Sequence, residues 1–280
     1  MWAILLPSLA ASLLVGFLCG LWGAVVVRLQ LSAVGFAMAH AAFAGAALGL
    51  VLGLSPVALS VAFALLVAGI LGPITETTRL PPEVVLGVVF PVTMALGFVF
   101  LSLVPGPALG SPALSLLWGS VLGVGWRDVS LLGGVLGLSA GFLLLFRREV
   151  LSLLLDRALA EEAGIPTRPY LWAVLFAVGT LVAIALRLVG GILIYSLLLL
   201  PAAAATQLAY DMKKIMGLAG LIGAGAAGMG FGTSWALDLP LGAAISLVGA
   251  TILALAVLFS PKRRRPRPEG PRLASRNLGR

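Results

Sequence analysis

The chain has a single histidine, His40, which is the side chain with the clearest capacity for chemistry. It falls inside an apolar stretch long enough to cross a bilayer. An ionisable group at membrane depth is costly, so it is a functional candidate by default. Neutral imidazole binds Zn²⁺ and related ions, although zinc usually takes three or four protein ligands. Two interpretations of His40 stay open: transient contact with a passing metal ion, or a buried histidine hydrogen-bonded across helices.

Composition limits the other chemistries that this chain could perform. Ten acidic residues and one histidine are too few for a convincing Ser/His/Asp triad or paired-carboxylate site inside the apolar segments. The single cysteine, Cys19, excludes a disulfide within the chain and a cysteine metal cluster. No Gly-x-x-x-x-Gly-Lys-[Ser/Thr] loop occurs, so the chain should not hydrolyse ATP itself. We therefore expect neither an enzyme nor a covalently bound cofactor.

Charged residues gather in one hydrophilic island that runs from Arg147 to Pro166. Asp156 is suited to cap the N-terminus of a short helix that begins at Arg157, and Gly164 with Pro166 should end it. The island could be a simple connecting loop. The alternative is an amphipathic cytoplasmic helix that serves as the docking site for a partner protein. The residues that would carry this docking role are Asp156, Arg157, Leu159, Glu161, Glu162, Gly164 and Ile165.

The elements that position these residues are membrane helices. The chain has 280 residues, of which 61% are hydrophobic and 10% charged, and its mean hydropathy is +1.15. Soluble domains carry about 25% charge, so a soluble domain is excluded. A helix needs about 20 apolar residues to cross the bilayer core, and the apolar stretches of this chain have about that length, which predicts an all-α membrane bundle. The nine spans are Trp2–Val27, Val34–Leu54, Pro56–Ile74, Val84–Val104, Val129–Phe146, Tyr170–Leu186, Val189–Leu208, Ile215–Trp235 and Leu241–Phe259.

The stretch Ser111–Gly125 is apolar but short, so we expect a re-entrant or partial helix there. If it spans fully, the count becomes ten and the N-terminal part inverts. The first stretch lacks a basic n-region and exceeds signal-peptide length, which predicts a retained helix. We therefore expect a multi-pass protein of the cell's inner (plasma) membrane, with a transmembrane domain over residues 1–260.

Basic residues give the orientation, because cytoplasmic loops are enriched in Lys and Arg. With nine spans and the N-terminus outside, nearly all of them fall on the cytoplasmic side, and only Arg127 and Arg187 lie outside. Eight of the eighteen basic residues lie from Lys262 onward, within a tail over residues 261–280. We expect this tail to be disordered, cytoplasmic and close to anionic membrane lipid, with no nucleic-acid partner.

The segment from Arg187 to Gln207 combines a glycine pair, an apolar run, Pro201 and four alanines. Small residues let membrane helices approach closely, and the glycine-rich run Gly217–Gly228 points the same way. Both segments are predicted to pack inside the bundle. Arg187, at the outer end of its span, reads as a snorkelling anchor or an inter-helix partner. Pro201 and Arg187 are kept as pathway or packing candidates.

Five segments of the chain share motifs with one family. They are Leu31-Ser-Ala-Val-Gly-Phe-Ala-Met-Ala-His-Ala; Arg79-Leu-Pro-Pro-Glu-Val-Val-Leu-Gly-Val; Leu116-Leu-Trp-Gly-Ser-Val-Leu-Gly; the island Asp156–Ile165; and Arg187-Leu-Val-Gly-Gly-Ile-Leu with Leu200-Pro-Ala-Ala-Ala-Ala after it. In this order they resemble the permease subunits of zinc/manganese/iron ATP-binding-cassette importers. The resemblance covers about Gly20 to Phe259, almost the whole membrane domain.

This resemblance implies a function and its partners. A pair of identical permeases would move a divalent metal ion inward, two ATPase subunits would engage the cytoplasmic helices, and an extracytoplasmic binding protein would deliver the metal. The island would act as the coupling helix. In the resembled family an aspartate precedes the matching histidine by four residues, but this chain has Phe36 there. A pair of chains could still offer two copies of His40 as weak ligands.

The missing aspartate leaves the cargo open. A permease of similar architecture could carry a metal chelate or a small organic nutrient. A secondary transporter without an ATPase is a further alternative, but such transporters more often carry intramembrane carboxylates, and none is evident at mid-span here.

Overall fold

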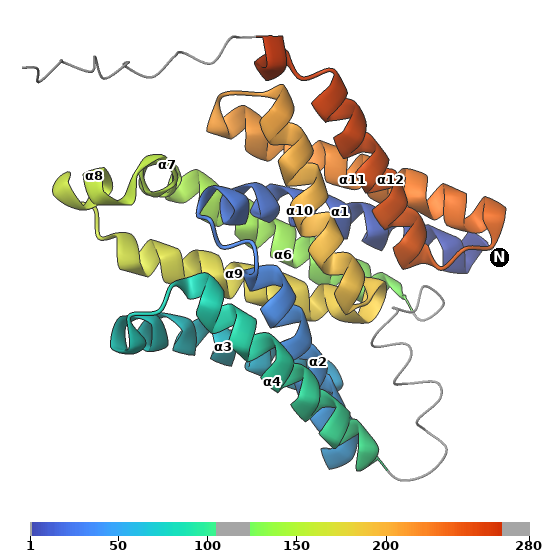
Figure 1. Cartoon of the computed structure of the whole chain (residues 1–280). Coiled ribbons are helices and arrows are strands. Elements are labelled where there is room, and N and C mark those ends of the chain that lie inside the picture. Colours follow the sequence, from blue (N-terminus) through green and yellow to red (C-terminus); the bar gives the residue numbers. More distant parts are fainter. Residues whose placement is uncertain (1, 105–123, 265–280) are drawn as a thin grey trace, which may run out of the picture.

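The computed structural model describes residues 2–104 and 124–264, and every regular element in that part of the chain is a helix (Figure 1). The long helices are α1 (Trp2–Arg28), α2 (Val34–Leu52), α3 (Pro56–Thr78), α4 (Pro82–Ser102), α6 (Trp126–Leu145), α9 (Thr167–Val189), α10 (Gly191–Leu208), α11 (Met212–Leu237) and α12 (Leu241–Leu258). Short elements are α7 (Arg147–Leu155), α8 (Arg157–Glu162) and the 3₁₀ turn η3 (Pro261–Arg264).

Each predicted span coincides with one long helix. Eight of these helices are long and apolar enough to cross a membrane, and α10 adds a shorter apolar helix, Leu193–Leu208. The all-α membrane bundle is therefore confirmed. The predicted partial helix at Ser111–Gly125 falls almost entirely outside the described residues.

Glycine and proline set the helix boundaries. Gly53 ends α2 in the left-handed conformation, with φ of 65°, and Ser55 then caps α3 by accepting a bond from the Ala58 amide. Between α9 and α10 the chain turns at Gly190 alone, where φ is 84°. A side chain would be strained there, so the glycine permits two long helices to follow each other without a loop.

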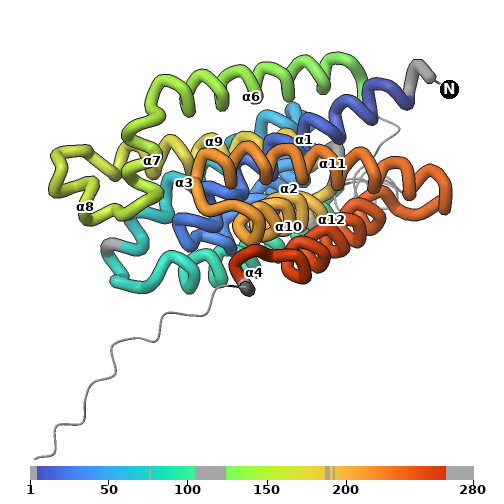
Figure 2. Tube along the Cα trace, turned by 90° about the horizontal axis from the view of Figure 1, so that it is seen from above, coloured from blue at the N-terminus to red at the C-terminus, as the bar shows by residue number. Residues whose placement is uncertain are grey.

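The most extensive helix contact is between α1 and α11, which run side by side (Figure 2). A Cβ atom built on Gly20 would lie 2.0 Å from the Ala219 carbonyl oxygen, and one on Gly223 would lie 2.1 Å from the Gly16 oxygen. The backbones therefore meet with no room for side chains. This is the close packing predicted for the glycine-rich run, and it stabilises the pair through dispersion contacts in place of a hydrophobic driving force.

Helix α10 is the packing helix that its sequence predicts. It contacts α1, α2, α11 and α12, and Pro201 with the alanines after it is largely buried. A Cβ atom on Gly23 of α1 would lie 1.8 Å from the Leu198 carbonyl oxygen. Neighbouring helices thus surround the turn in which Pro201 removes a backbone donor, the setting in which a membrane helix tolerates proline.

Helix α6 lies along the outside of the bundle and is the least buried span (Figure 2). A hydrogen bond links it to the core: the indole Nε1 of Trp22 in α1 donates to Ser139 Oγ in α6 at 3.0 Å. Trp22 is fully buried and also packs against Phe142. A tryptophan N–H needs a partner when it is buried, so this bond fixes which face of α6 turns inward.

One end of the bundle collects the basic side chains, and we call it the basic end. There Arg28 at the end of α1 meets α7, which leads into α8 at the left of Figure 1, whereas the N-terminus lies at the right. The described basic residues at this end include Arg28, Arg147, Arg148, Arg157, Arg168, Lys213, Lys214 and Lys262. Their gathering agrees with the distribution on which the predicted orientation was based.

Candidate functional site

His40 lies in a cluster of aromatic rings where α2, α4 and α10 meet. Its ring centroid is 4.6 Å from that of Phe36, one turn earlier on α2, and 4.6 Å from that of Phe90 on α4. Phe36 also contacts Phe90 at 4.4 Å and Tyr195 of α10 at 5.1 Å. We call these four residues the aromatic cluster. Phe36 therefore does more than replace a carboxylate, because it joins three helices around the histidine.

The hydrogen bond of His40 defines which of its nitrogens is available. Nδ1 lies 2.9 Å from the Phe36 carbonyl oxygen. A carbonyl oxygen only accepts, so Nδ1 carries the proton, and in the neutral ring Nε2 keeps its lone pair. A ring held in this way through its other nitrogen is the usual arrangement of a metal-binding histidine. The bond is made within α2, and among the described residues no hydrogen bond from His40 to another helix is found, in contrast to the alternative of a histidine bonded across helices.

The described residues contain no cluster of three or more His, Cys, Asp and Glu side chains that could hold a metal ion. His40 is 6% exposed, and its ring neighbours are aromatic. Three acids could in principle substitute for the missing aspartate, namely Glu76, Glu83 and Asp238. Glu83 lies in the first turn of α4, Asp238 is the C-cap of α11, and Glu76 lies in the last turn of α3 with its side chain outside the described part. A single copy therefore offers one ligand nitrogen and several ring faces, which can attract a cation only weakly.

The hydrophilic island forms two helices rather than the one that its sequence predicts. α7 covers Arg147–Leu155, and α8 begins at Arg157. Between them Asp156 is extended, and its Oδ1 accepts bonds from the amides of Ala158 at 2.8 Å and Leu159 at 3.2 Å. The predicted cap at Asp156 is confirmed. The helix that the sequence did not predict is α7. Asp156 ends α7 as its C-cap and begins α8 as its N-cap, so the island is divided at this residue.

The predicted end of α8 is also confirmed. Gly164 has φ of 80°, and the Ile165 amide donates to the Ala160 carbonyl oxygen at 3.0 Å, which closes the turn. Inside this turn Arg157 Nε lies 3.2 Å from Glu161 Oε1 and 3.2 Å from Thr167 Oγ1, and the Thr167 hydroxyl donates to Glu161. These bonds join α8 to the start of α9.

The Thr167 hydroxyl bond, with Arg157 beside it, lowers the pKa of Glu161 below its ordinary value. The carboxylate that holds this corner together therefore stays ionised to lower pH than a free glutamate. Glu161 and Arg157 are each about half exposed, so we assign this ion pair a role in geometry more than in stability.

The outer surface of the island carries side chains suited to a protein partner. Leu155 is 70% exposed and Leu159 is 63% exposed, while Glu162 projects on the same short helix. Exposed leucines beside charged residues at the end of a membrane bundle are typical of an interaction surface. The structure thus places Asp156, Arg157, Glu161, Gly164 and Ile165 in the framework of the island, and Leu159 and Glu162 on its surface.

Several residues of these sites could not be expected from the sequence. Phe90 and Tyr195 join the aromatic cluster, and Arg28 donates from Nε to the Leu154 carbonyl oxygen at 2.7 Å, tying α1 to the end of α7. Only helix packing brings them to these places. Arg187 lies in the last turn of α9, and its side chain is outside the described part.

Comparisons with known proteins agree with this architecture. The model of the ABC 3 transport family matches residues 1–260. A manganese transport system membrane protein, MntC, of Listeria innocua is 30% identical over 93% of this chain and 92% of its own length. A probable iron transport system membrane protein of Haemophilus influenzae is 28% identical over 92% and 90%. The solved structure of PsaBC from Streptococcus pneumoniae in complex with Fab superposes with a TM-score of 0.83, at 27% identity and 93% coverage of both chains.

Proposed function

The chain belongs to the ABC 3 transport family and is the permease subunit of an ATP-driven metal importer, and on this basis we propose how it works. Two copies of the chain together carry manganese, iron or zinc into the cell. The observation that carries the proposal is the family match along residues 1–260, which includes every membrane helix described here. Manganese is favoured among the metals, since it appears in the name of the relative with the higher identity. Family membership also disfavours an ATPase-independent secondary transporter.

In the proposed orientation the protein lies in the inner (plasma) membrane of the cell, and its basic end faces the cytoplasm. The concentration of Arg and Lys there supports it. Separate ATPase subunits would then contact α8, and an extracytoplasmic binding protein would deliver the metal at the opposite end. Residues 1–260 would form the permease domain and residues 261–280 a cytoplasmic tail.

We assign the first contact with the cargo inside the bundle to His40. Its Nε2 carries the lone pair, and its ring is fixed by the Phe36 carbonyl. One nitrogen per chain binds a divalent ion weakly, which suits a pathway because an ion must leave each site as readily as it enters. A second copy of the chain would supply a second imidazole.

Replacement of His40 by alanine should strongly reduce the transport of metal. Loss of even an outer partner of a metal ligand lowers affinity about 10–100-fold, so loss of the sole nitrogen ligand should reduce ATP-dependent uptake by at least about tenfold. The measurement is elemental analysis of Mn²⁺, Fe²⁺ and Zn²⁺ in proteoliposomes that contain permease, ATPase and binding protein. Thr93→Val is the matched control, because Thr93 is a buried polar residue of α4 whose hydrogen bonds, within the described part of the chain, stay inside its own helix.

Full uptake by His40→Ala would keep the family and remove His40 from the path. A different cargo, a metal chelate or small organic nutrient, is favoured by the aromatic cluster, which offers flat apolar faces and no carboxylate. That alternative would be established by an assembled, ATP-hydrolysing complex that takes up a chelated metal but none of the free ions.

The docking role of α8 predicts that Glu161→Ala with Glu162→Ala weakens binding of the ATPase subunit. Single exposed ion pairs contribute little, so the loss of two exposed carboxylates together should lower affinity roughly two- to thirtyfold. The measurement is co-purification of the ATPase at graded concentrations, with insertion of the permease checked in the same membranes.

Two further variants separate docking from local unfolding. Glu162→Ala alone leaves the bonds among Arg157, Glu161 and Thr167 intact, and it should still lower the affinity for the ATPase subunit, by less than the double variant does. Glu83→Ala removes an exposed acid from the first turn of α4 and should leave affinity unchanged. Equal binding by wild type and the double variant would remove α8 from the contact.

A further inference from the structure

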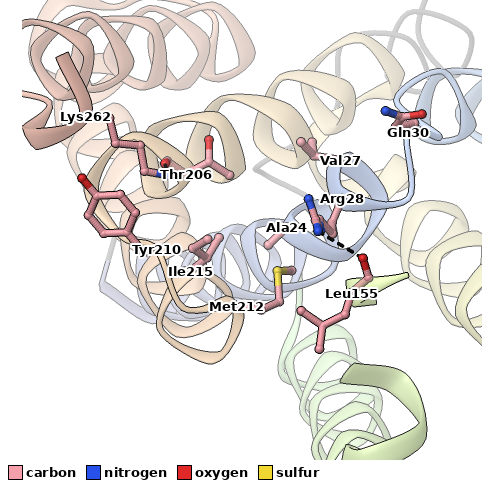
Figure 3. A pocket seen from close by; sticks show the side chains of 10 residues that line it. All are labelled: Ala24, Val27, Arg28, Gln30, Leu155, Thr206, Tyr210, Met212, Ile215 and Lys262. Atoms are coloured by element: carbon pink, nitrogen blue, oxygen red, sulfur yellow. Dashed lines mark hydrogen bonds between the residues drawn. The ribbon is translucent and has the colours of Figure 1, made fainter. Parts of the chain in front are cut away.

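A pocket of about 370 Å³ opens at the basic end, within the size range of about 300–1,000 Å³ that small ligands occupy. It lies between the ends of α1, α7 and α10 and the starts of α11 and η3. Figure 3 shows Arg28 entering from α1 and Lys262 from the opposite side, with Ala24, Ile215 and Met212 between them. This junction plays no part in the transport pathway proposed above.

The pocket carries positive charge that its walls do not neutralise. Among the described residues its lining contains two cations, Arg28 and Lys262, and no acidic residue. Arg28 donates to the carbonyl oxygens of Leu154 at 2.7 Å and Leu155 at 3.3 Å. Lys262 Nζ donates to the Thr206 carbonyl and lies 4.8 Å from the Tyr210 ring centroid. All of these partners are uncharged, so they orient the two cations and leave the net charge of the pocket unbalanced.

Two carboxylates lie next to lining residues in the sequence, but both already cap helices. Asp156 accepts from the amides at the start of α8, and Asp211 accepts from the Lys213 amide at the start of α11. A divalent cation would be repelled by such a pocket, so it is unsuited to the metal cargo. An anion would be attracted.

We propose that this pocket binds a phosphate group, and that the group belongs to the headgroup of an anionic phospholipid. Guanidinium and ammonium groups are the side chains that recognise phosphate, and Gln30 offers a further amide at the rim. Apolar lining residues, among them Val27, Leu155 and Ile215, suit the hydrocarbon next to a headgroup. Basic pockets between membrane helices on the cytoplasmic side bind anionic headgroups. The proposal uses the orientation above but not the identity of the cargo.

The position of the pocket gives binding a consequence. Arg28 joins α1 to the end of α7, directly before α8, and Lys262 joins η3 to the end of α10. A phosphate between the two cations would connect these four segments. The lipid would thereby hold the island, through α7, against the ends of α1 and α10 and against η3.

The test uses the full chain in detergent micelles, titrated with short-chain phosphatidylglycerol, with phosphatidylcholine, and with inorganic phosphate at matched ionic strength. Binding is read by calorimetry and by native mass spectrometry. Phosphatidylglycerol should bind and phosphatidylcholine should not. Each Lys or Arg adds about 1 kcal/mol to anionic lipid binding, so Lys262→Gln should weaken it about fivefold. Lys213→Gln, an exposed lysine outside the pocket lining, should not weaken it.

The arms of the experiment separate the possible sources of the phosphate. Binding of inorganic phosphate as tightly as phosphatidylglycerol, with the same loss in Lys262→Gln, supports the phosphate site and assigns it to a soluble ligand. Equal weakening by Lys213→Gln would overturn the proposal, because it reports general surface charge. The proposal is also overturned if neither phosphatidylglycerol nor inorganic phosphate binds. If Lys262→Gln then weakens co-purification of the ATPase, the two cations belong to a protein contact and not to a phosphate site.

Discussion

Replacement of Gly20 by valine is expected to prevent the bundle from assembling. The new Cβ atom alone would lie 2.0 Å from the Ala219 carbonyl oxygen, and the obstacle is backbone of α11 that no rotamer change removes. Ordinary overpacking costs about 1–3 kcal/mol where neighbours can shift. Here two helices would have to separate where their backbones touch, so the free energy of unfolding should fall by at least about 3 kcal/mol.

The measurement is the thermal unfolding midpoint in detergent micelles, followed by tryptophan fluorescence. Gly225→Val provides the control on α11: no atom lies within 4 Å of a Cβ atom built there, so only helix propensity changes. A midpoint for Gly20→Val that equals that of Gly225→Val would mean that α1 and α11 do not pack as described.

The membrane bundle could be predicted from the sequence because bilayer thickness fixes the length of an apolar helix. All nine predicted spans correspond to long helices, and the caps at Asp156 and Gly164 followed from local backbone chemistry. The second helix of the island was missed. The helix Arg147–Leu155 begins with three charged residues, and the mostly apolar stretch of six residues after them is too short to carry a clear periodic signal before the cap.

The aromatic cluster and the phosphate pocket could not be predicted in the same way. Phe36 and His40 are one helical turn apart, so their contact could be predicted from the sequence. Phe90 and Tyr195 come from helices that lie 50 or more residues away in the chain. Arg28 and Lys262 are likewise separated by almost the whole chain. Such juxtapositions depend on which helix faces meet, and one apolar face resembles another in sequence.

Replacement of Phe36 by aspartate is expected to make the stability of the chain depend on metal. The carboxylate would stand one turn before His40, so both would face the same side of α2. Without metal, a charged side chain inside a membrane helix costs about 2.5–3.5 kcal/mol, and the contacts of Phe36 with Phe90 and Tyr195 are lost as well. The unfolding midpoint should therefore drop well below that of the natural chain.

Addition of Mn²⁺ should then restore much of this loss. A metal that binds only the folded state at a concentration 100 times its Kd adds about 2.7 kcal/mol, comparable to the cost of the charge. Phe36→Asn has the same shape without the charge, so it should lose stability but gain little from Mn²⁺. His40→Ala combined with Phe36→Asp should remove the recovery, since the carboxylate then lacks its nitrogen partner. If Mn²⁺ restores the double variant as well as the single one, His40 Nε2 does not face the position of residue 36, and the metal path must be sought elsewhere in the bundle.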